Sequence, residues 1–273
     1  MSTAPNSNAI HTRLWNEVPE PDNAFAARIA YCGGYDVYGE LLGRARWVDM
    51  LYLLFRGEAP STAQADLLEA VAVALANPGP RDASVHAAMS GGVGGSTSAS
   101  CLMAALAVGA GQLAGGREVF LAMQAWADCG TDLAAWRQRL ATPPVANAGS
   151  AWPTPDHAPG FDPHGTSTST PVRQTLACCA RLSPGPCLPW LAAQLSALEA
   201  AAGCPLALSG VAAAAFLDLG LTPEQGEMLH LLLRLPGAAA HALEQRQQGY
   251  KQFPFGSMTL DDTPRDTTAG VSS

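Results

Sequence analysis

The sequence predicts an all-α protein, and three observations carry that prediction. Apolar residues recur at helical spacing through much of the chain, whereas no segment shows the convincing alternation of a half-buried strand. Hydrophobic residues make up 48% of the 273 residues, which is enough for a substantial core in one or two domains. Clusters of glycine and proline separate the apolar segments and mark the turns between helices.

Capping and breaking residues define the first predicted helices. Gly57 ends an apolar helix, and Ser61 and Gln64 have the capping-box spacing that starts the next one. Glycine and proline interrupt the helical pattern at residues 77–80 and again at Gly91-Gly92. We therefore expect helices over 47–55, from 62 to 76 and near 82–90.

Residues 98–117 are the most informative stretch of the chain. They predict an almost wholly apolar helix of small residues that runs into a glycine elbow, Gly115-Gly116. A helix that is apolar all round is expected to be buried on every side. An elbow without side chains lets the backbone come close to another group, such as a ligand.

The second half of the chain continues as helices around one long loop. Residues 141–171 are rich in Pro, Gly, Ser and Thr, and a loop of that length is typical of a ligand loop or of a disordered segment. The polar tail from Gly256 is expected to be mobile. The predicted helices span about 117–127, 131–140, 172–182, 190–202, 209–219, 223–234 and 237–248.

Charge and hydropathy exclude several classes of function. The net charge is −8 and there is no Lys/Arg cluster, which argues against nucleic-acid binding. Residues 1–8 lack the features of a secretory signal, and the apolar run at 101–114 is too short to span a bilayer. We expect a cytoplasmic protein that does not bind membranes. Because charged residues make up only 14% of the chain, we also expect an oligomer.

The cysteines indicate neither a disulfide framework nor a metal site. The seven cysteines are scattered and odd in number, and Cys178-Cys179 is an adjacent pair instead of a C-x-x-C motif. Reduced and mostly buried thiols are therefore expected.

Five segments, in order and at the right spacing, resemble the citrate synthase family, and in particular its small citryl-CoA lyase-like members. The resemblance covers residues 33–254; the alternative is an unrelated helical protein rich in Ala and Leu. It implies the all-α citrate synthase-like fold, with a large domain from 1–116 and 209–273, a smaller domain over 117–208, and an active cleft between them. The segments are Gly34–Asp36, Tyr52–Pro60, Ala215–Leu221, Arg234–Gly237 and Ala240–Gln245.

The resemblance also implies a reaction class. Family members join or split an acetyl-CoA carbon and a 2-oxo acid, as in the conversion of citryl-CoA to acetyl-CoA plus oxaloacetate. An Asp acts as the general base, one His stabilises the enol oxygen, a second polarises the oxo-acid carbonyl, and arginines bind carboxylates. The implied ligand is a coenzyme A thioester, with no tightly bound cofactor and no metal.

The sequence departs from this pattern at the catalytic positions. Ala114 stands where the family's Leu-His-Gly-Gly motif has its histidine, and Ser209 stands where the family has its base. Pro78 replaces a further histidine, and His164 is displaced by one residue within its loop. The catalytic positions of the family are therefore degenerate in this chain.

Several residues remain candidates for a site, each with a structural alternative. His164 is either a replacement carbonyl-polarising group or a solvated loop residue, and Ser209 is either catalytic or a helix N-cap. Arg234 occupies a substrate-binding position of the family but could equally satisfy carbonyls at a helix end. The predicted site comprises His164 and Ser209 as catalytic candidates, and Arg234, Arg173, Gly115 and Gly116 as substrate-binding candidates.

These substitutions leave two functions open. The chain is either a divergent enzyme that uses replacement residues such as His164, or a non-catalytic homologue that serves as a scaffold or regulatory subunit of an active paralogue. A binding protein for a CoA thioester or a carboxylate is a further alternative. The resemblance implies a homodimer, or a heterodimer with a family paralogue, packed through helices around 84–114.

Overall fold

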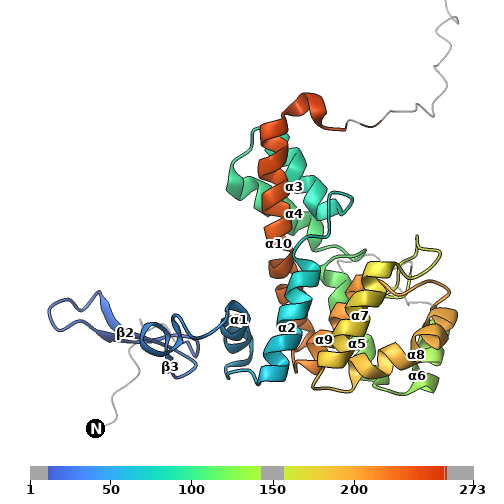
Figure 1. The fold of residues 1–273 in the computed structure, drawn as a ribbon, viewed down its shortest axis with the longest axis horizontal. Helices are drawn as coiled ribbons and strands as arrows, with labels where there is room; N and C mark the ends of the chain where they lie inside the picture. Colours follow the sequence, from blue (N-terminus) through green and yellow to red (C-terminus); the bar gives the residue numbers. More distant parts are fainter. Residues whose placement is uncertain (1–11, 143–156, 255, 257–273) are drawn as a thin grey trace, which may run out of the picture.

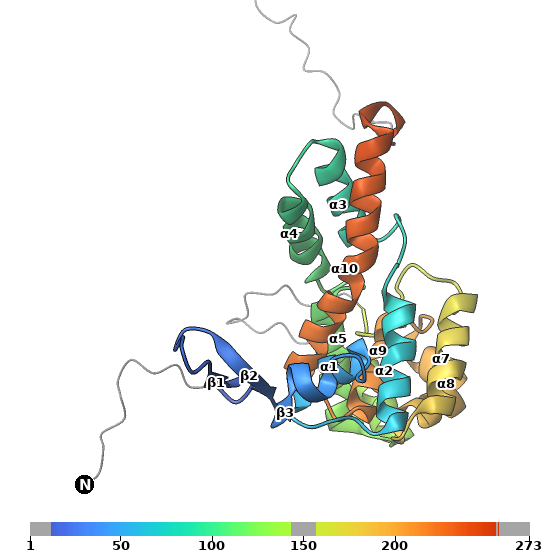
Figure 2. The same cartoon turned by 60° about the vertical axis from the view of Figure 1, so that its left-hand side comes forward.

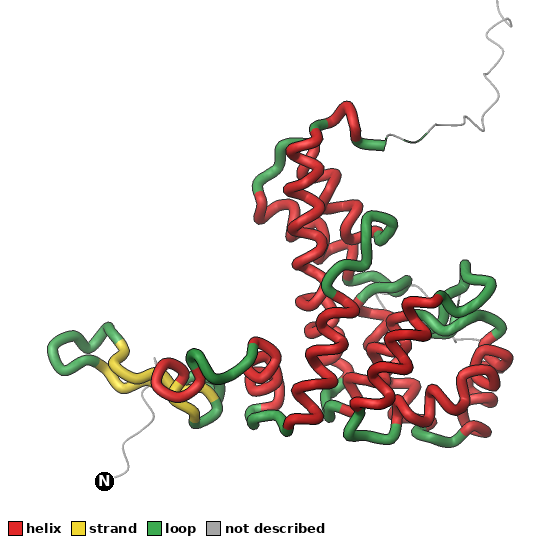
Figure 3. The backbone as a smooth tube through the Cα atoms, viewed as in Figure 1, coloured by secondary structure: helices red, strands yellow, loops and turns green. Residues whose placement is uncertain are grey.

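The computed structural model describes residues 12–142, 157–254 and 256, and these residues are mostly helical, which confirms the predicted class (Figure 3). Three of the predictions concern residues outside this description: residues 1–8, the tail after Gly256, and positions 143–156 of the 141–171 loop. The helices are α1 (Trp47–Arg56), α2 (Thr62–Leu75), α3 (Ala83–Val93), α4 (Ser98–Gly109), α5 (Gly116–Cys129), α6 (Leu133–Ala141), α7 (Thr170–Leu182), α8 (Cys187–Ala202), α9 (Leu208–Asp218) and α10 (Pro223–Gln248), with short helical turns η1 (Val37–Leu41) and η2 (Tyr250–Gln252).

A small antiparallel sheet precedes the helices, although the sequence predicts no strand. Its order is β1 (Asn16–Pro19), β2 (Ala27–Cys32) and β3 (Tyr35–Asp36). Ala30 and Cys32 of β2 are buried and alternate with the partly buried Ile29 and Tyr31. Because residues 29–32 are all apolar, the sequence shows no alternation of apolar and polar residues that would reveal a strand. The sheet stands off the helical body as an arm in both views (Figures 1 and 2).

Two hydrophobic clusters organise the helical body. The larger cluster joins α1, α2, α5 to α9 and the first half of α10, around fully buried side chains such as Phe216 and Met123. The smaller cluster joins α3, α4 and the second half of α10, and it includes Val85, Ala105 and Ala238. Figures 1 and 2 show the two groups of helices one above the other, with α10 running through both. The predicted division at 116/117 and 208/209 stays a prediction.

Helix α10 is one continuous helix, so the prediction of two helices, 223–234 and 237–248, is wrong. Pro236 lies inside it and has no N–H to donate to the helical ladder. The next N–H, that of Gly237, donates instead to the carbonyl of Ala76 just after α2, at 2.7 Å. A Cβ at position 237 would lie 2.5 Å from that carbonyl oxygen, so the close approach of the two backbones requires glycine.

Helix α4 ends earlier and is less buried than the sequence predicts. It stops at Gly109, and a non-helical turn connects it to α5, so the glycine elbow begins α5 and does not end α4. Cys101 and Ala105 are buried against α3 and α10, but Met103 is 61% exposed and Val108 is 46% exposed. The expectation that this helix is buried on every side is therefore wrong for the isolated chain.

Local sequence signals elsewhere are confirmed. Gly57 caps α1 in the left-handed conformation, and Ser61 and Gln64 form the capping box of α2. All seven cysteines are free, and burial raises the pKa of Cys179 to about 11 and that of Cys187 to about 12.

Within the described ranges, no helix is both long and apolar enough to cross a membrane. The same ranges contain no group of three or more His, Cys, Asp or Glu side chains that could hold a metal ion.

Candidate functional site

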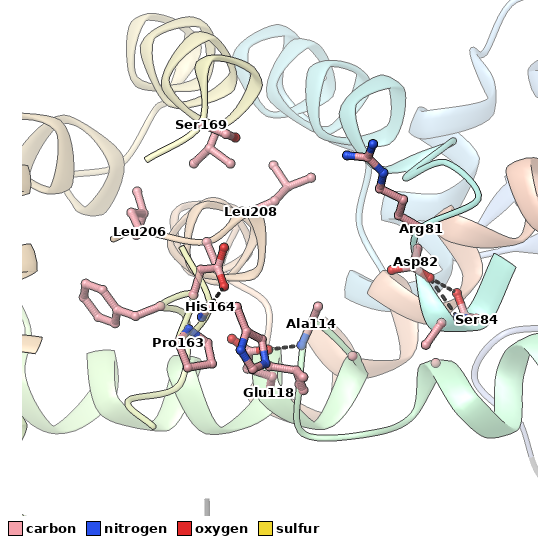
Figure 4. A pocket seen from close by; sticks show the side chains of 18 of the residues that line it. Arg81, Asp82, Ser84, Ala114, Glu118, Pro163, His164, Ser169, Leu206 and Leu208 are labelled. Atoms are coloured by element: carbon pink, nitrogen blue, oxygen red, sulfur yellow. Dashed lines mark hydrogen bonds between the residues drawn. The ribbon is translucent and has the colours of Figure 1, made fainter. Parts of the chain in front are cut away.

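A cavity of about 380 Å³ lies where the two groups of helices meet. Figure 4 shows that Arg81, Asp82 and Ser84 border one side, while Pro163 and His164 come from the loop on another. The start of α3, the end of α4 with the turn after it, α5, the 161–169 loop, residues 206–208 and Arg234 of α10 all contribute to its lining. The cavity is thus assembled from segments far apart in the chain.

Ala114 lines this cavity in a strained conformation. Its φ is +52°, and it is the one non-glycine residue with positive φ in the described part of the chain. Such a conformation costs about 1–2 kcal/mol for alanine. Its N–H donates to the Glu118 carboxyl, and its carbonyl accepts from Nη1 of Arg234 at 2.6 Å, so both polar backbone groups have partners. The methyl side chain offers the cavity no donor, acceptor or base.

Glu118 is a functional-site residue that sequence reasoning missed. Its side chain is only 1% exposed, lines the cavity, and accepts three hydrogen bonds. The donors are the N–H of Ala114, the N–H of Gly160 at 2.9 Å and the hydroxyl of Ser209 at 2.8 Å. This carboxyl group therefore joins the start of α5 to the long loop and to α9. The only sequence signal for it is its place two residues after Gly116.

Ser209 is buried behind the cavity and is not among the described residues that line it. It is the second residue of α9, and the cap position is Ala207, which makes no side-chain cap bond. The expected N-cap role is therefore wrong, whereas the catalytic role of Ser209 stays a prediction. Its hydroxyl is instead committed to the Glu118 carboxyl.

His164 does line the cavity, on an exposed part of the loop. Its N–H donates to Asp162 Oδ1 at 2.9 Å, which holds the loop backbone and leaves the imidazole at the cavity wall (Figure 4). His164 therefore shares the lining of this cavity with Ala114 and Arg234.

The remaining substrate-binding candidates divide into two groups. Gly115 lines the cavity, whereas Gly116 and Arg173 are absent from its described lining. Gly116 packs under Leu231, whose Cγ would lie 3.0 Å from an added Cβ. Arg173 is exposed and donates to the Thr168 carbonyl at 2.5 Å. The fold therefore brings together His164, Gly115 and Arg234 but not Gly116 or Arg173.

Arg234 reaches the cavity from the middle of α10, so the alternative of a helix-terminal arginine is wrong. Its Nη2 forms a buried ion pair with Asp82, whose other carboxyl oxygen caps α3 by accepting from the Ser84 N–H at 3.0 Å. His230, one turn earlier, has its Nε2 3.3 Å from Nη1 of Arg234. Burial, and secondly the Arg234 charge, lower the pKa of His230 to about 3, so this imidazole is neutral.

Arg81 is the remaining guanidinium group of the cavity. It is exposed at the cavity mouth and makes no ion pair with the acidic side chains of the described residues. Figure 4 shows it beside Asp82, on the side of the cavity that faces Leu208 and Ser169. It is therefore free to contact an anionic group of a ligand.

A scan against protein-family models and a search of curated proteins found no match to this chain. Solved structures do match. Citryl-CoA lyase from Hydrogenobacter thermophilus is 18% identical and has a TM-score of 0.69, covering 93% of this chain and 97% of its own.

Two ATP citrate lyase structures match equally well, each with a TM-score of 0.69. The enzyme from Methanothrix soehngenii, in complex with citrate and coenzyme A, is 16% identical and covers 98% of this chain. A mutant of the Methanosaeta concilii enzyme, in complex with (3S)-citryl-CoA, is 15% identical and covers 96%. This chain spans only 44% and 43% of these two proteins. At such identities the likeness concerns architecture: this chain has the mostly helical, citrate synthase-like fold of citryl-CoA lyase.

Proposed function

We propose that this chain binds a coenzyme A thioester or a small carboxylic acid in the cavity and does not by itself cleave or form a carbon–carbon bond. The observation that carries the proposal is the hydrogen-bond network around Glu118. In this network the N–H of Ala114 and the hydroxyl of Ser209 both donate to Glu118. At these two positions the family's reaction needs a donor and a base.

The expected loss of reaction rate is large. A missing general base costs about 10²–10⁴ in rate, and a missing oxyanion donor costs about 10²–10³, although such effects do not simply add. A serine cannot deprotonate a thioester methyl group unaided. An aspartate at 209 would bring its carboxyl group against that of Glu118, because the Ser209 hydroxyl already lies 2.8 Å from Glu118 Oε1. Serine at position 209 avoids this repulsion and instead donates a hydrogen bond to Glu118.

Binding has separate support. The cavity has a volume of about 380 Å³, the guanidinium groups of Arg81 and Arg234 border it, and most of its remaining lining residues are apolar. Structures of the same fold hold citrate with coenzyme A, or (3S)-citryl-CoA. We therefore assign this cavity the same general class of ligand.

A second candidate is catalysis of citryl-CoA cleavage, or of the reverse reaction, by replacement residues. The specific observation in its favour is His164, which lines the cavity from the exposed loop, where it could polarise a carbonyl group. The two candidates differ in measurable turnover.

We predict that the purified chain shows no turnover of citryl-CoA, and no citrate formation from acetyl-CoA and oxaloacetate, while a CoA thioester binds in calorimetry. Arg81→Gln should weaken binding, because it removes the exposed cation at the cavity mouth. The matched control is Arg137→Gln, on the exposed side of α6, which should leave binding unchanged. Turnover of about 1 s⁻¹ or more that is abolished by His164→Ala would support catalysis by replacement residues. The absence of any thioester or carboxylate binding would refute the binding function.

We also propose that a second copy of this chain covers the outer side of α4. Met103 of α4 is 61% exposed and Leu243 of α10 is 51% exposed, and neither lines the cavity in the described residues. Helices α4 and α10 pack against each other, and Leu102 and Leu243 line one small cavity between them. Exposed apolar side chains of this kind are typical of an oligomer interface.

Light scattering should therefore give the mass of a dimer for the native protein and of a monomer for Met103→Glu. Val73→Glu is the matched control, because Val73 is 70% exposed on α2, away from this side. A native monomer that captures no further chain would contradict the proposal, whereas co-purification with a paralogue that carries the missing His and Asp would favour the heterodimer and a scaffold or regulatory role.

A further inference from the structure

We infer that the cavity selects a ligand whose acyl group is uncharged over one whose acyl group carries a carboxylate. This inference rests on the proposed binding function and specifies its ligand. It starts from the ionisable side chains that line the cavity in the described residues: three carboxyl groups (Asp82, Glu118 and Asp162), two guanidinium groups (Arg81 and Arg234) and the imidazole of His164. His157, outside this lining, has its Nε2 3.9 Å from Glu118 Oε1. A site built for a di- or tricarboxylate needs the opposite balance.

Arg234 is already neutralised. Its Nη2 is paired with Asp82, and its Nη1 donates to the Ala114 carbonyl at 2.6 Å, so both terminal nitrogens have acceptors within the protein. The pair has little access to water, because the side chains of Arg234 and Asp82 are only 8% and 13% exposed. A carboxylate of a ligand would therefore have to share this guanidinium group with Asp82, which already neutralises its charge.

The buried part of the cavity lining also disfavours a second negative charge. Glu118 is only 1% exposed, and Phe161 and Leu206 are buried apolar residues of the same lining. Like charges repel more strongly in such a poorly solvated site than in water. An apolar acyl chain, in contrast, gains from burial against these side chains.

The mouth of the cavity has the complementary character. Arg81 is exposed there and forms no ion pair with another described residue, so one anionic group of a ligand can be held at the entrance without entering the interior. The arrangement fits a ligand with its charge at one end and an apolar chain at the other. A short-chain acyl thioester has this form, because its phosphates belong to the coenzyme A portion.

The test compares butyryl-CoA with succinyl-CoA, which differ by a terminal methyl group against a terminal carboxylate. Calorimetry on the native protein should show butyryl-CoA binding at least about tenfold more tightly. Coenzyme A alone gives the contribution of the shared portion. The pair 2-oxobutyrate and oxaloacetate repeats the comparison without coenzyme A, and the monocarboxylate should again bind more tightly.

Asp82→Asn tests the cause of the preference. Asparagine keeps the cap of α3 but removes the charge that neutralises Arg234, so the preference for butyryl-CoA should fall severalfold as succinyl-CoA gains affinity. Asp132→Asn is the matched control, since Asp132 is the N-cap of α6 and does not line the cavity in the described residues; the preference should be unchanged.

The outcomes separate this inference from the proposal on which it rests. If succinyl-CoA binds the native protein as tightly as butyryl-CoA or more so, the inference is overturned while the binding function stands. If neither thioester nor either oxo acid binds, both are overturned. Should Asp82→Asn fail to fold, Asp162→Asn at the cavity wall must lower the preference in the same direction, and an unchanged preference there would count against the inference.

Discussion

Replacing Arg234 with Met is expected to lower the free energy of unfolding by about 3–5 kcal/mol, because it leaves a buried carboxylate without its partner. The Arg234 and Asp82 side chains are 8% and 13% exposed, so water cannot replace the lost guanidinium group well. The same substitution removes the donor to the Ala114 carbonyl, which holds the strained turn in the cavity lining. Urea denaturation measures the change.

The matched control for this prediction is an exposed ion pair. Arg139 and Asp128 have side chains 41% and 63% exposed, and Arg139→Met should cost no more than about 1 kcal/mol. The double variant Asp82→Asn with Arg234→Met should recover part of the loss, since no charge then remains unpaired. Equal effects of Arg234→Met and Arg139→Met would show that the buried pair does not stabilise the fold.

Most of the helices could be predicted because their signals are local. Ser61 and Gln64 satisfy each other's backbone donors within one turn, and Gly57 ends α1 through its own left-handed conformation. Such features need no information from the rest of the chain. The predicted ends of these helices agree with the structure because neighbouring residues alone determine them.

The misplaced elements depend on tertiary contacts. Nothing near Pro236 in sequence shows that α10 continues through it, because the bond that accommodates the break reaches the Ala76 carbonyl at the end of α2. The sheet was equally hidden, since β2 buries only Ala30 and Cys32 and its order comes from pairing with β1 and β3. The exposed side of α4 cannot be told from a buried one by composition alone.

The site shows the same limit. The resemblance marked Ala114 and Ser209 as substitutions, but the group that links them, Glu118, is separated from Ser209 by 91 positions and matches no motif. Asp82 and Arg234 are 152 positions apart. Neither partner could be identified before the fold brought α3, α5, α9 and α10 together.

These partners change the meaning of the substitutions. An alanine and a serine, taken separately, are losses of a donor and a base. Around Glu118 they form a satisfied network in which the serine donates and the alanine backbone donates, and Arg234 bonds the other side of the same turn. Fully satisfied buried networks rigidify a site. Under the proposed binding function, this network holds one wall of the cavity in a fixed shape.

His230 provides a second large effect, which depends on pH. Its ring is fully buried, and burial together with the nearby Arg234 charge lowers its pKa from 6.5 to about 3. The unfolded chain therefore binds a proton at this residue below about pH 6.5, while the folded protein does not. The stability that comes from the neutral ring is present above pH 6.5 and is lost as the pH falls toward 3, by about 1.4 kcal/mol for each pH unit.

His230→Leu should remove this dependence, because leucine binds no proton in either state. Nδ1 of His230 has no hydrogen-bond partner within the described residues, so leucine forfeits no bond on that side of the ring. Denaturation of both proteins from pH 7 to pH 4 should show the native stability falling more steeply, by about 1.4 kcal/mol per pH unit below pH 6. Between pH 7.5 and 9 the two slopes should be equal, since the imidazole is neutral in both states there. Parallel slopes down to pH 4 would mean that the folded protein accepts the proton, and that the contact between His230 and Arg234 is looser than the 3.3 Å separation implies.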